Sequence, residues 1–433
     1  MNSLWNEYPE KISFPKLTEN IKTDVLIIGG GLAGLLCAHK LKNNGVDCVL
    51  LEAKTICSGI TCNTTAKITL QHGLIYHKLI NNIGEENARL YLSAQIKALD
   101  EYENLCKSIE CDYEKKDSYV YSLSDKNKIE KETDALMRLG VDADFCYVQN
   151  LPFETAGAVR VKNQAQFHPL KFAYKIAENL PIYENTKILE FGKGKLITDC
   201  TEISCKKIIV ATHFPIFNKH GMFFLKMYQH RSYVLALEGA EDLNGMYVDE
   251  DEKGLSFRNY KNLLLIGGGS HRTGKKGGSF QEIEAFANKY YKNAIPVNRW
   301  ATQDCMTLDK IPYVGHYSKN TPDLFVATGF NKWGMTSSMI SAIILSDLVC
   351  EKQNEYSSLF SPLRSILHPQ LAVNTFESLK GILTPTTPRC PHLGCALKYN
   401  PQERSWDCPC HGSRFSEDGE LIDNPATDDK KNI

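Results

Sequence analysis

Residues 24–34 read DVLIIGGGLAG, and this stretch decides the fold of the N-terminal part of the chain. The branched apolar run predicts a strand, the glycines after it a tight turn, and the residues that follow a helix. Gly29, Gly31 and Gly34 have the G-x-G-x-x-G spacing of a dinucleotide site, where the backbone approaches a pyrophosphate at a helix N-terminus. A glycine-rich turn alone is weak evidence, but the strand before it and the helix after it favour a dinucleotide site over an ordinary loop.

A dinucleotide site of this kind also needs an acidic residue at the end of the second strand, and this sequence has one there. Glu52 lies 18 residues beyond Gly34 and directly follows a second apolar run, residues 48–51. A carboxylate at the end of that strand can accept hydrogen bonds from ribose hydroxyls. An acid here argues against a 2′-phosphate, but it leaves FAD and NAD both open.

Bulk composition excludes several classes of protein. A chain of 433 residues can form two or three domains, and its net charge of −1 gives no electrostatic case for nucleic acid or an anionic membrane. No apolar run is long enough to span a bilayer, and the N-terminus does not have the pattern of a secretory signal. Eleven of the 15 cysteines are scattered, which fits the reducing cytoplasm, whereas the other four crowd into residues 390–410.

Two loops look suited to a cofactor. Residues 58–69, SGITCNTTAKIT, are rich in hydroxyls, and Thr61, Thr64 and Thr65 could donate to phosphate or flavin oxygens; a solvated turn is the alternative. The strand at 207–211 ends in ATHFP, a turn that we expect near the cofactor.

Amphipathic spacing predicts helices over residues 85–108, 126–139 and 169–177, to which we assign no chemistry. Residues 228–270 contain several short alternating runs and predict an antiparallel sheet in a second domain. Within it, Arg258 could hold a substrate carboxylate bidentately, or could be a strand-edge arginine facing water.

The cofactor pattern returns late in the chain. The strand at 324–327 runs into TGFNKWGMTSSM, which opens a helix over 336–349. Backbone N–H groups and the helix dipole would stabilise a flavin ring that becomes anionic on reduction. Residues 351–377 are polar and predict an irregular linker.

In this order, GGGLAG, Glu52, ATHFP and ATGFNKWGMT resemble the FAD-dependent oxidoreductases of the D-amino-acid oxidase and glycine oxidase type. The resemblance implies hydride transfer from an amine carbon to the flavin. It also implies an α/β fold with a discontinuous FAD domain and an antiparallel α+β substrate domain. We expect an N-terminal arm over 1–22, an FAD domain over about 23–110, 151–215 and 300–350, and a substrate domain over about 111–150 and 216–299.

The same resemblance implies roles for individual residues. Gly29, Gly31 and Gly34 would hold the pyrophosphate and Glu52 the ribose, while Arg258 would bind the substrate carboxylate. The remaining residues expected around the cofactor are Ile188 at the adenine, Ala211 beside the cofactor, and Gly329, Trp333, Gly334, Met335 and Thr336 along the isoalloxazine.

A metal site is predicted near the C-terminus. Two boxes, CPHLGC at 390–395 and CPCHGS at 408–413, place two thiols and two imidazoles at C-x-H and C-x2-H spacing. Zinc could use four such ligands but would leave two cysteines idle, whereas a [2Fe–2S] cluster can take Cys2His2 ligation.

Both boxes resemble the Rieske proteins of cytochrome bc-type complexes. The resemblance implies that Ser413 donates to a cluster sulfur. It further implies four ligands, Cys390, His392, Cys408 and His411, and a Cys395–Cys410 disulfide. Phe415 stands where high-potential members carry a tyrosine, which predicts a lower potential. Residues 378–433 also look too few for the whole supporting β sheet.

An FAD oxidoreductase fused to a C-terminal Rieske domain is a known bacterial arrangement, which nearly the whole chain resembles. We therefore expect a cytoplasmic enzyme that oxidises a small amine or amino acid and passes electrons through the cluster to an acceptor. Two alternatives stay open: an oxygen-using oxidase whose tail is only structural, and an electron-transfer protein without an amine substrate. The sequence does not name the substrate, the acceptor or the oligomeric state.

Overall fold

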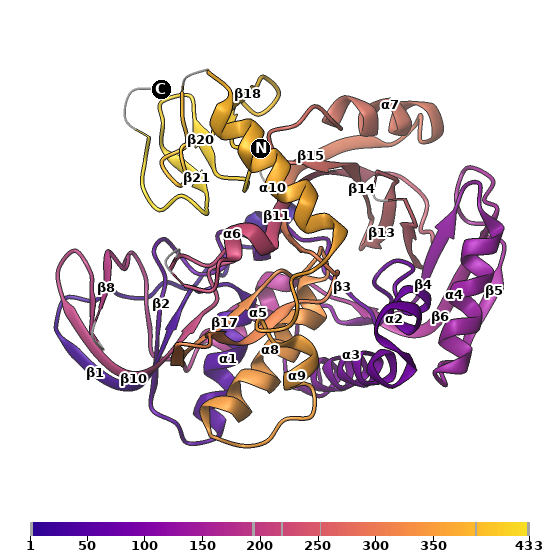
Figure 1. Cartoon of the computed structure of the whole chain (residues 1–433). Coiled ribbons are helices and arrows are strands. Elements are labelled where there is room, and N and C mark those ends of the chain that lie inside the picture. Colours follow the sequence, from indigo (N-terminus) through magenta and orange to yellow (C-terminus); the bar gives the residue numbers. More distant parts are fainter. Residues whose placement is uncertain (1–2, 193–194, 218–219, 252, 386–387, 431–433) are drawn as a thin grey trace.

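The structure is a computed structural model that describes residues 3–192, 195–217, 220–251, 253–385 and 388–430. Its strands form three sheets, with most of the helices packed against the first two. In Figure 1 the first sheet lies at the left, the second at the right and the small third sheet at the top.

Eight strands of the described chain form the first sheet, in the order β16-β17-β10-β1-β2-β7, with the β8–β9 hairpin beside β10. Its central neighbours, from β17 to β7, pair in parallel, so their carboxyl ends share one edge. Helices α1 (Leu32–Asn43) and α8 (Gly334–Val349) pack together in its core. The strands are β1 (Ile21–Ile28), β2 (Cys48–Leu51), β7 (Ile182–Tyr183), β8 (Glu190–Gly192), β9 (Lys195–Ile197), β10 (Glu202–Val210), β16 (Tyr313–Ser318) and β17 (Thr321–Thr328).

The second sheet has nine strands within the described residues, and every neighbouring pair except β4–β12 is antiparallel. The antiparallel sheet expected around 228–270 is therefore present. Its strands are β3 (Lys67–Ile68), β4 (Glu114–Ser122), β5 (Ala143–Cys146), β6 (Gly157–Gln166), β11 (Met227–Glu238), β12 (Met246–Asp249), β13 (Ser256–Tyr260), β14 (Leu263–Arg272) and β15 (Ile295–Thr307).

Two strands lie in a different sheet from the one expected. The sequence places β6 and residues 300–307 of β15 in the cofactor domain, but both pair within the second sheet. Alternating side chains identify a strand without revealing its partner, and here the pairing of β15 along the whole of β11 decides its place.

The expected helices are confirmed as α3 (Glu85–Cys106), α4 (Lys126–Arg138) and α5 (Pro169–Ala177). The irregular linker expected over 351–377 is wrong in part, because α10 (Pro369–Leu383) occupies its last third, with proline in the first turn where it suits a helix start. The others are η1 (Leu4–Glu7), η2 (Ile60–Asn63), α2 (Tyr76–Ile83), α6 (Phe223–Lys226), α7 (Phe280–Tyr290) and α9 (Ser357–Phe360). Across the described ranges, no helix is both long and apolar enough to cross a membrane.

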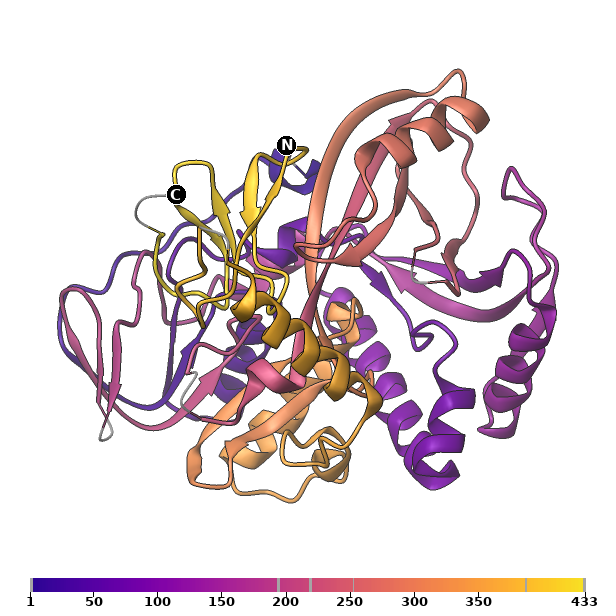
Figure 2. The same cartoon turned by 45° about the horizontal axis from the view of Figure 1, so that its top comes forward.

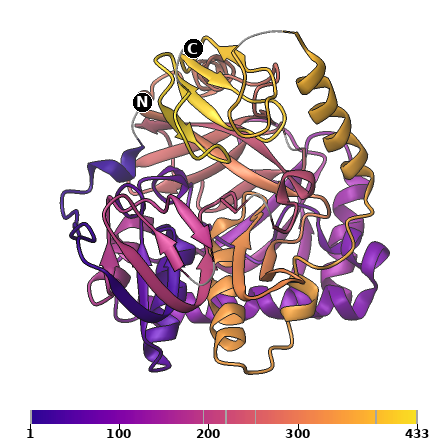
Figure 3. The ribbon, with the colours of Figure 1, turned by 60° about the vertical axis from the view of Figure 1, so that its left-hand side comes forward.

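The C-terminal region has a sheet of its own. Strands β18 (Lys398–Asn400), β19 (Ser405–Asp407), β20 (Arg414–Ser416) and β21 (Leu421–Asp423) form an antiparallel sheet. Figure 3 shows α10 running along the outside of the molecule towards this sheet, and Figure 2 shows the sheet lying against the rest of the chain. Each of these four strands is only three residues long, so the sheet of the C-terminal region is small.

Candidate functional site

A cavity of about 810 Å3 lies where residues from all three sheets meet. The carboxyl ends of β1 and β2 form one wall, strands of the second sheet form another, and residues of the C-terminal region, including Asp423 and Asn424, close it. Twelve of the fourteen residues expected around the cofactor line this cavity; Gly34 and Thr336 do not.

The glycine turn has the tight geometry that its spacing predicted. Gly29 has a φ of +111°, and a Cβ there would lie 2.5 Å from the Ala211 carbonyl oxygen. A Cβ on Gly34 would lie 2.0 Å from the carbonyl oxygen of Gly29, so this glycine lets α1 pack against the turn. Gly31 immediately precedes α1 and faces the cavity, where the helix N-terminus favours an anionic group.

Glu52 lies beside this turn and orders it. Its carboxylate accepts hydrogen bonds from the Gly30 N–H (2.7 Å) and the Lys54 N–H (2.8 Å). Burial raises the pKa of Glu52, although both backbone donors oppose that shift. The carboxylate therefore lies at the cavity wall, in the place where the sequence predicted a ribose contact.

The hydroxyl-rich loop forms the next part of the wall. Thr61 Oγ1 accepts from the Leu32 N–H at the start of α1 (3.1 Å), and Thr64 Oγ1 accepts from the Ala66 N–H (2.9 Å). Two buried tryptophans fix the loop from behind: Trp5 Nε1 donates to the Thr64 carbonyl (2.7 Å) and Trp300 Nε1 to that of Asn63 (2.9 Å). The N-terminal segment thus supports the cavity as well as forming an arm.

The opposite end of the cavity is built around Trp333. Its ring stacks on His72, with the ring centroids 4.8 Å apart and the planes 15° from parallel. His72 in turn contacts the Tyr91 hydroxyl through Nδ1 (2.7 Å) and Thr336 Oγ1 through Nε2 (3.0 Å). Burial lowers the pKa of His72 to about 3, so this ring is neutral and rigidly held. Thr336 therefore does not line the cavity itself but holds His72, which does.

Arg258 does not line the cavity. Its side chain is completely buried, Nη1 donates to the Ala66 carbonyl (3.0 Å), and the guanidinium lies over the rings of Trp5 and Tyr260. In this position Arg258 supports the backbone beside Lys67 and does not reach into the open space.

Lys67 and Asp304 are among the charged residues of the cavity wall to which the sequence analysis gave no role. Lys67 is 9% exposed, and its ammonium donates to Thr65 Oγ1 (3.2 Å). Burial, together with the charge of Arg258, lowers the pKa of Lys67 to about 7. Asp304 lines the same cavity, and burial raises its pKa to about 6 in spite of the positive charge of Lys332. Only the AKIT stretch next to Thr65 pointed to either residue.

Lys67 predicts a pH-dependent stability of the flavin-free protein. Between pH 7 and its ordinary pKa of 10.5, the unfolded chain keeps a proton that the folded chain releases. The free energy of unfolding therefore rises with pH over this range, by up to about 1.4 kcal/mol per pH unit. Lys67→Met should lose this slope in urea unfolding at pH 7, 8 and 9, and the exposed control Lys107→Met should keep it. Equal slopes in all three proteins would contradict the buried, neutral lysine.

The two C-terminal boxes converge as their spacing predicted. Cys390, Cys408 and His411 are each at most 2% exposed, and the rings of His392 and His411 lie 5.1 Å apart. Nδ1 of His411 is buried without a hydrogen-bond partner, which is what a nitrogen reserved for a metal requires. Two thiols and two imidazoles in one buried place fit a [2Fe–2S] cluster.

The expected disulfide is absent. Every cysteine of the described residues is a free thiol, including Cys395 and Cys410. The Sγ atoms of these two residues and of Cys408 lie within 4.8 Å of one another, and Cys410 Sγ also lies 3.7 Å from the carbonyl oxygen of Glu377. Phe415 is fully buried, and Ser413 Oγ accepts from the Ala426 N–H (3.0 Å).

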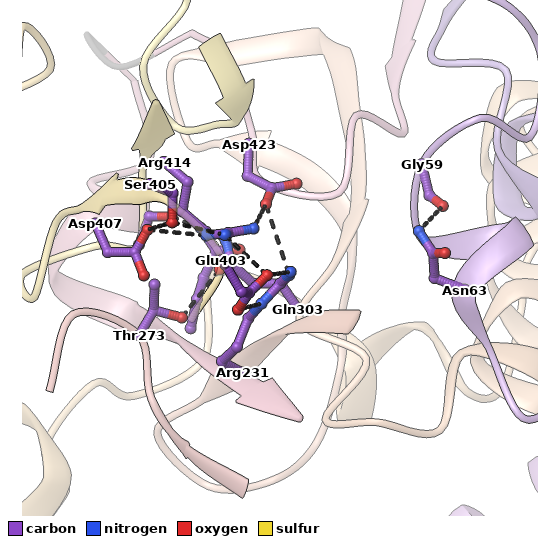
Figure 4. A network of polar contacts seen from close by, with 12 residues as sticks. Gly59, Asn63, Arg231, Thr273, Gln303, Glu403, Ser405, Asp407, Arg414 and Asp423 are labelled. Carbon is purple, nitrogen blue, oxygen red and sulfur yellow. Dashed lines mark hydrogen bonds and ion pairs between the residues drawn. The ribbon is translucent and has the colours of Figure 1, made fainter. Parts of the chain in front are cut away.

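A buried charge network joins the cluster region to the second sheet (Figure 4). Glu403 accepts from Arg231 of β11 (Nε to Oε1, 2.9 Å) and from Arg414 of β20 (Nη2 to Oε2, 3.0 Å). Arg414 also binds Asp407 (2.9 Å) and Asp423 (3.0 Å). Because Arg231, Arg414 and Asp423 line the cavity, this network is part of its wall.

Comparisons with known proteins agree with both parts of this site. Residues 24–348 match the family "FAD dependent oxidoreductase", and residues 364–433 match the "Rieske [2Fe-2S] domain". The Rieske 2Fe-2S iron-sulfur protein YhfW of Bacillus subtilis (strain 168) is 34% identical over 99% of this chain and 97% of its own.

Two solved structures have the fold of the larger part. Glycine oxidase from Geobacillus kaustophilus superposes with a TM-score of 0.67 at 18% identity, over 79% of this chain and 99% of that one. L-proline dehydrogenase from P. horikoshii gives 0.68 at 16% identity, over 81% and 98%.

Proposed function

The chain belongs to the FAD-dependent oxidoreductases of the D-amino-acid oxidase type, with a C-terminal Rieske domain, and on that premise we propose that it is a cytoplasmic amino-acid dehydrogenase whose electrons leave through the cluster. The family binds FAD and the Rieske domain binds a [2Fe–2S] cluster. The free thiols throughout the described chain support a reducing compartment.

One observation carries the proposal: the cluster domain forms part of the wall of the cofactor cavity. Ala211, Thr212 and His213 line the cavity, and the next residue, Phe214, has its ring 6.3 Å from the ring of His392. Asn424, from the cluster domain, donates to the carbonyls of Thr212 (2.6 Å) and Phe214 (3.0 Å). A short, hydrogen-bonded segment thus connects the cavity to a ligand of the cluster.

The charges of the cavity support an amino acid as the substrate. Lys67, which is neutral above pH 7 without a partner, would take up a proton beside a substrate carboxylate, and Asp304 offers an anion for an ammonium group. Arg258 has no access to the cavity, so the proposal assigns the carboxylate contact to Lys67 in its place. Burial of both charged groups strengthens such pairing, since screening by water is reduced.

FAD held in this cavity would accept a hydride from the α-carbon of the substrate as a C=N bond forms, and water would then hydrolyse the imine. FAD supplies the two-electron acceptor and the cluster a one-electron carrier. The proton of this hydride would go to solvent, and its two electrons would go one at a time to an acceptor.

The test is anaerobic addition of amino acids and simple amines to the purified holoprotein. We expect flavin bleaching, followed by the paramagnetic signal of the reduced cluster, and in Cys408→Ser we expect bleaching alone. Bleaching without a cluster signal, with stoichiometric peroxide in air that Cys408→Ser does not change, would instead indicate a plain oxidase. Reduction by a partner reductase but by no amine would indicate an electron-transfer protein.

A further inference from the structure

Four consecutive carbonyls of the second cluster box are held by side chains of the second sheet. Arg272 Nε donates to the Pro409 carbonyl (3.1 Å), and Arg272 Nη2 donates to that of Cys410 (2.9 Å). Gln229 Nε2 donates to the His411 carbonyl (2.8 Å) and Gln303 Nε2 to the Gly412 carbonyl (2.8 Å). The oxidoreductase part therefore binds the carbonyls of residues 409–412, on both sides of His411.

The side-chain amides of Gln229 and Gln303 are hydrogen-bonded to each other, and their N–H groups and carbonyl oxygens all have partners. Gln229 and Gln303 lie on the paired strands β11 and β15 and are 1% and 0% exposed. Gln303 Nε2 also donates to Gln229 Oε1 (2.9 Å), while Thr273 Oγ1 donates to Gln303 Oε1 (3.0 Å). A second N–H of Gln229 reaches the Asn424 carbonyl (2.8 Å). Buried amides with every group used are rigid, because any displacement leaves a polar atom unpaired.

The contact is also close in a steric sense. Gly412 has a φ of +93°, and a Cβ there would lie 2.6 Å from Cβ of Gln229. A Cβ on Gly274 would lie 2.6 Å from the backbone nitrogen of Pro409. Both histidine rings of the cluster site also lie next to aromatic rings of the oxidoreductase part. The ring of His411 lies 6.1 Å from that of Phe224, and the ring of His392 lies beside that of Phe214. The imidazole side of the cluster site is thus turned towards the oxidoreductase part.

We propose that Gln229, Gln303 and Arg272 are positioning residues that fix the cluster against the flavin cavity, which makes it a stationary relay and not a mobile carrier. This inference rests on the proposed transfer of electrons from flavin to cluster. Groups that orient metal ligands from the second layer typically change affinity or activity by about 10- to 100-fold when removed. We expect the same scale for the transfer rate, since these side chains set the place of the whole His411 loop.

The test compares Gln303→Met and Gln229→Met with Gln402→Met, an exposed glutamine of the cluster domain. In the two clamp variants of the holoprotein, the amides of residues 405–416 should exchange with deuterium roughly tenfold faster. The cluster signal should grow roughly tenfold more slowly once the flavin is reduced, at unchanged iron content. Gln402→Met should match the wild type in both.

Wild-type exchange and wild-type transfer rates in both clamp variants would overturn the positioning role. If the methionine variants do not fold, Gln303→Asn keeps the amide and shortens its reach by one methylene, so the same two readouts decide. The exchange measurement needs no electron transfer, so it still tests the clamp if the flavin of the wild type proves unable to reduce the cluster.

Discussion

Replacing Gly34 by alanine is expected to yield a folded protein that purifies almost free of FAD. The new Cβ would lie 2.0 Å from the carbonyl oxygen of Gly29, far inside van der Waals contact. That oxygen belongs to backbone, so α1 or the glycine turn must shift, at a cost of about 1–3 kcal/mol. A shift of this size at the pyrophosphate site should weaken FAD binding by roughly 10- to 100-fold.

The measurement is the ratio of flavin to protein after purification, with the dissociation constant from titration of the flavin-free protein. Gly45→Ala is the matched control: it lies just after α1 with a φ of +74° and has no atom within 4 Å of the added Cβ. The Gly45→Ala variant has the strain of an alanine at positive φ but no clash of the added Cβ with other atoms. It should therefore be less stable than the wild type but still bind FAD. Full FAD occupancy in Gly34→Ala would show that the turn does not hold the cofactor.

Local spacing explains which parts of the site could be read from the sequence. The glycine turn and the two cysteine–histidine boxes are each contained in about a dozen residues, and their geometry follows from the order of residue types. Neither the place of β15 beside β11 nor that of β6 beside β4 could be found in this way. Strand pairing depends on contacts between distant segments, and alternation is the same in either sheet.

The residues that the sequence analysis missed at the site also act through contacts with segments that are distant in sequence. Gln303 and Arg272 lie more than a hundred positions before the carbonyls that they bind, and no motif marks them. For Arg258 the sequence suggested a role that the structure does not support. Its strand pattern suggested that its side chain faced a substrate, whereas the ring of Trp5 covers the guanidinium. Lys67 lies within the hydroxyl-rich stretch at 58–69, but only its burial beside Arg258 shows that its pKa is lowered.

Glu403→Gln is expected to loosen the cluster domain from the oxidoreductase part. The glutamine keeps the shape of the side chain but removes the charge that pairs Arg231, 8% exposed, with Arg414, 3% exposed. Breaking a buried ion pair on one side typically costs about 3–5 kcal/mol, because the partner charges stay buried. Asp423 still lies 3.8 Å from Arg231, so we expect a loss near the lower end of that range.

The same network predicts how the loss depends on pH. Burial alone would raise the pKa of Glu403, but the hydrogen bonds and charges of Arg231 and Arg414 outweigh it and lower the pKa to about 2, from an ordinary value of 4.5. The stabilisation is therefore complete above pH 4.5 and is lost as the pH falls from there towards 2. The Gln variant should lack this part of the acid sensitivity.

Urea unfolding of the holoprotein, followed by the visible absorbance of the cluster, measures both effects. Glu417→Gln is the control, since Glu417 pairs with the exposed Arg404 on the surface of the same domain, where water screens the pair, and the variant should keep close to wild-type stability. Equal losses of unfolding free energy in the two variants would mean that the buried charge network does not help to hold the cluster domain on the oxidoreductase part. A large loss confined to Glu403→Gln would show that the contact between cluster and cavity depends on a charge supplied by each part.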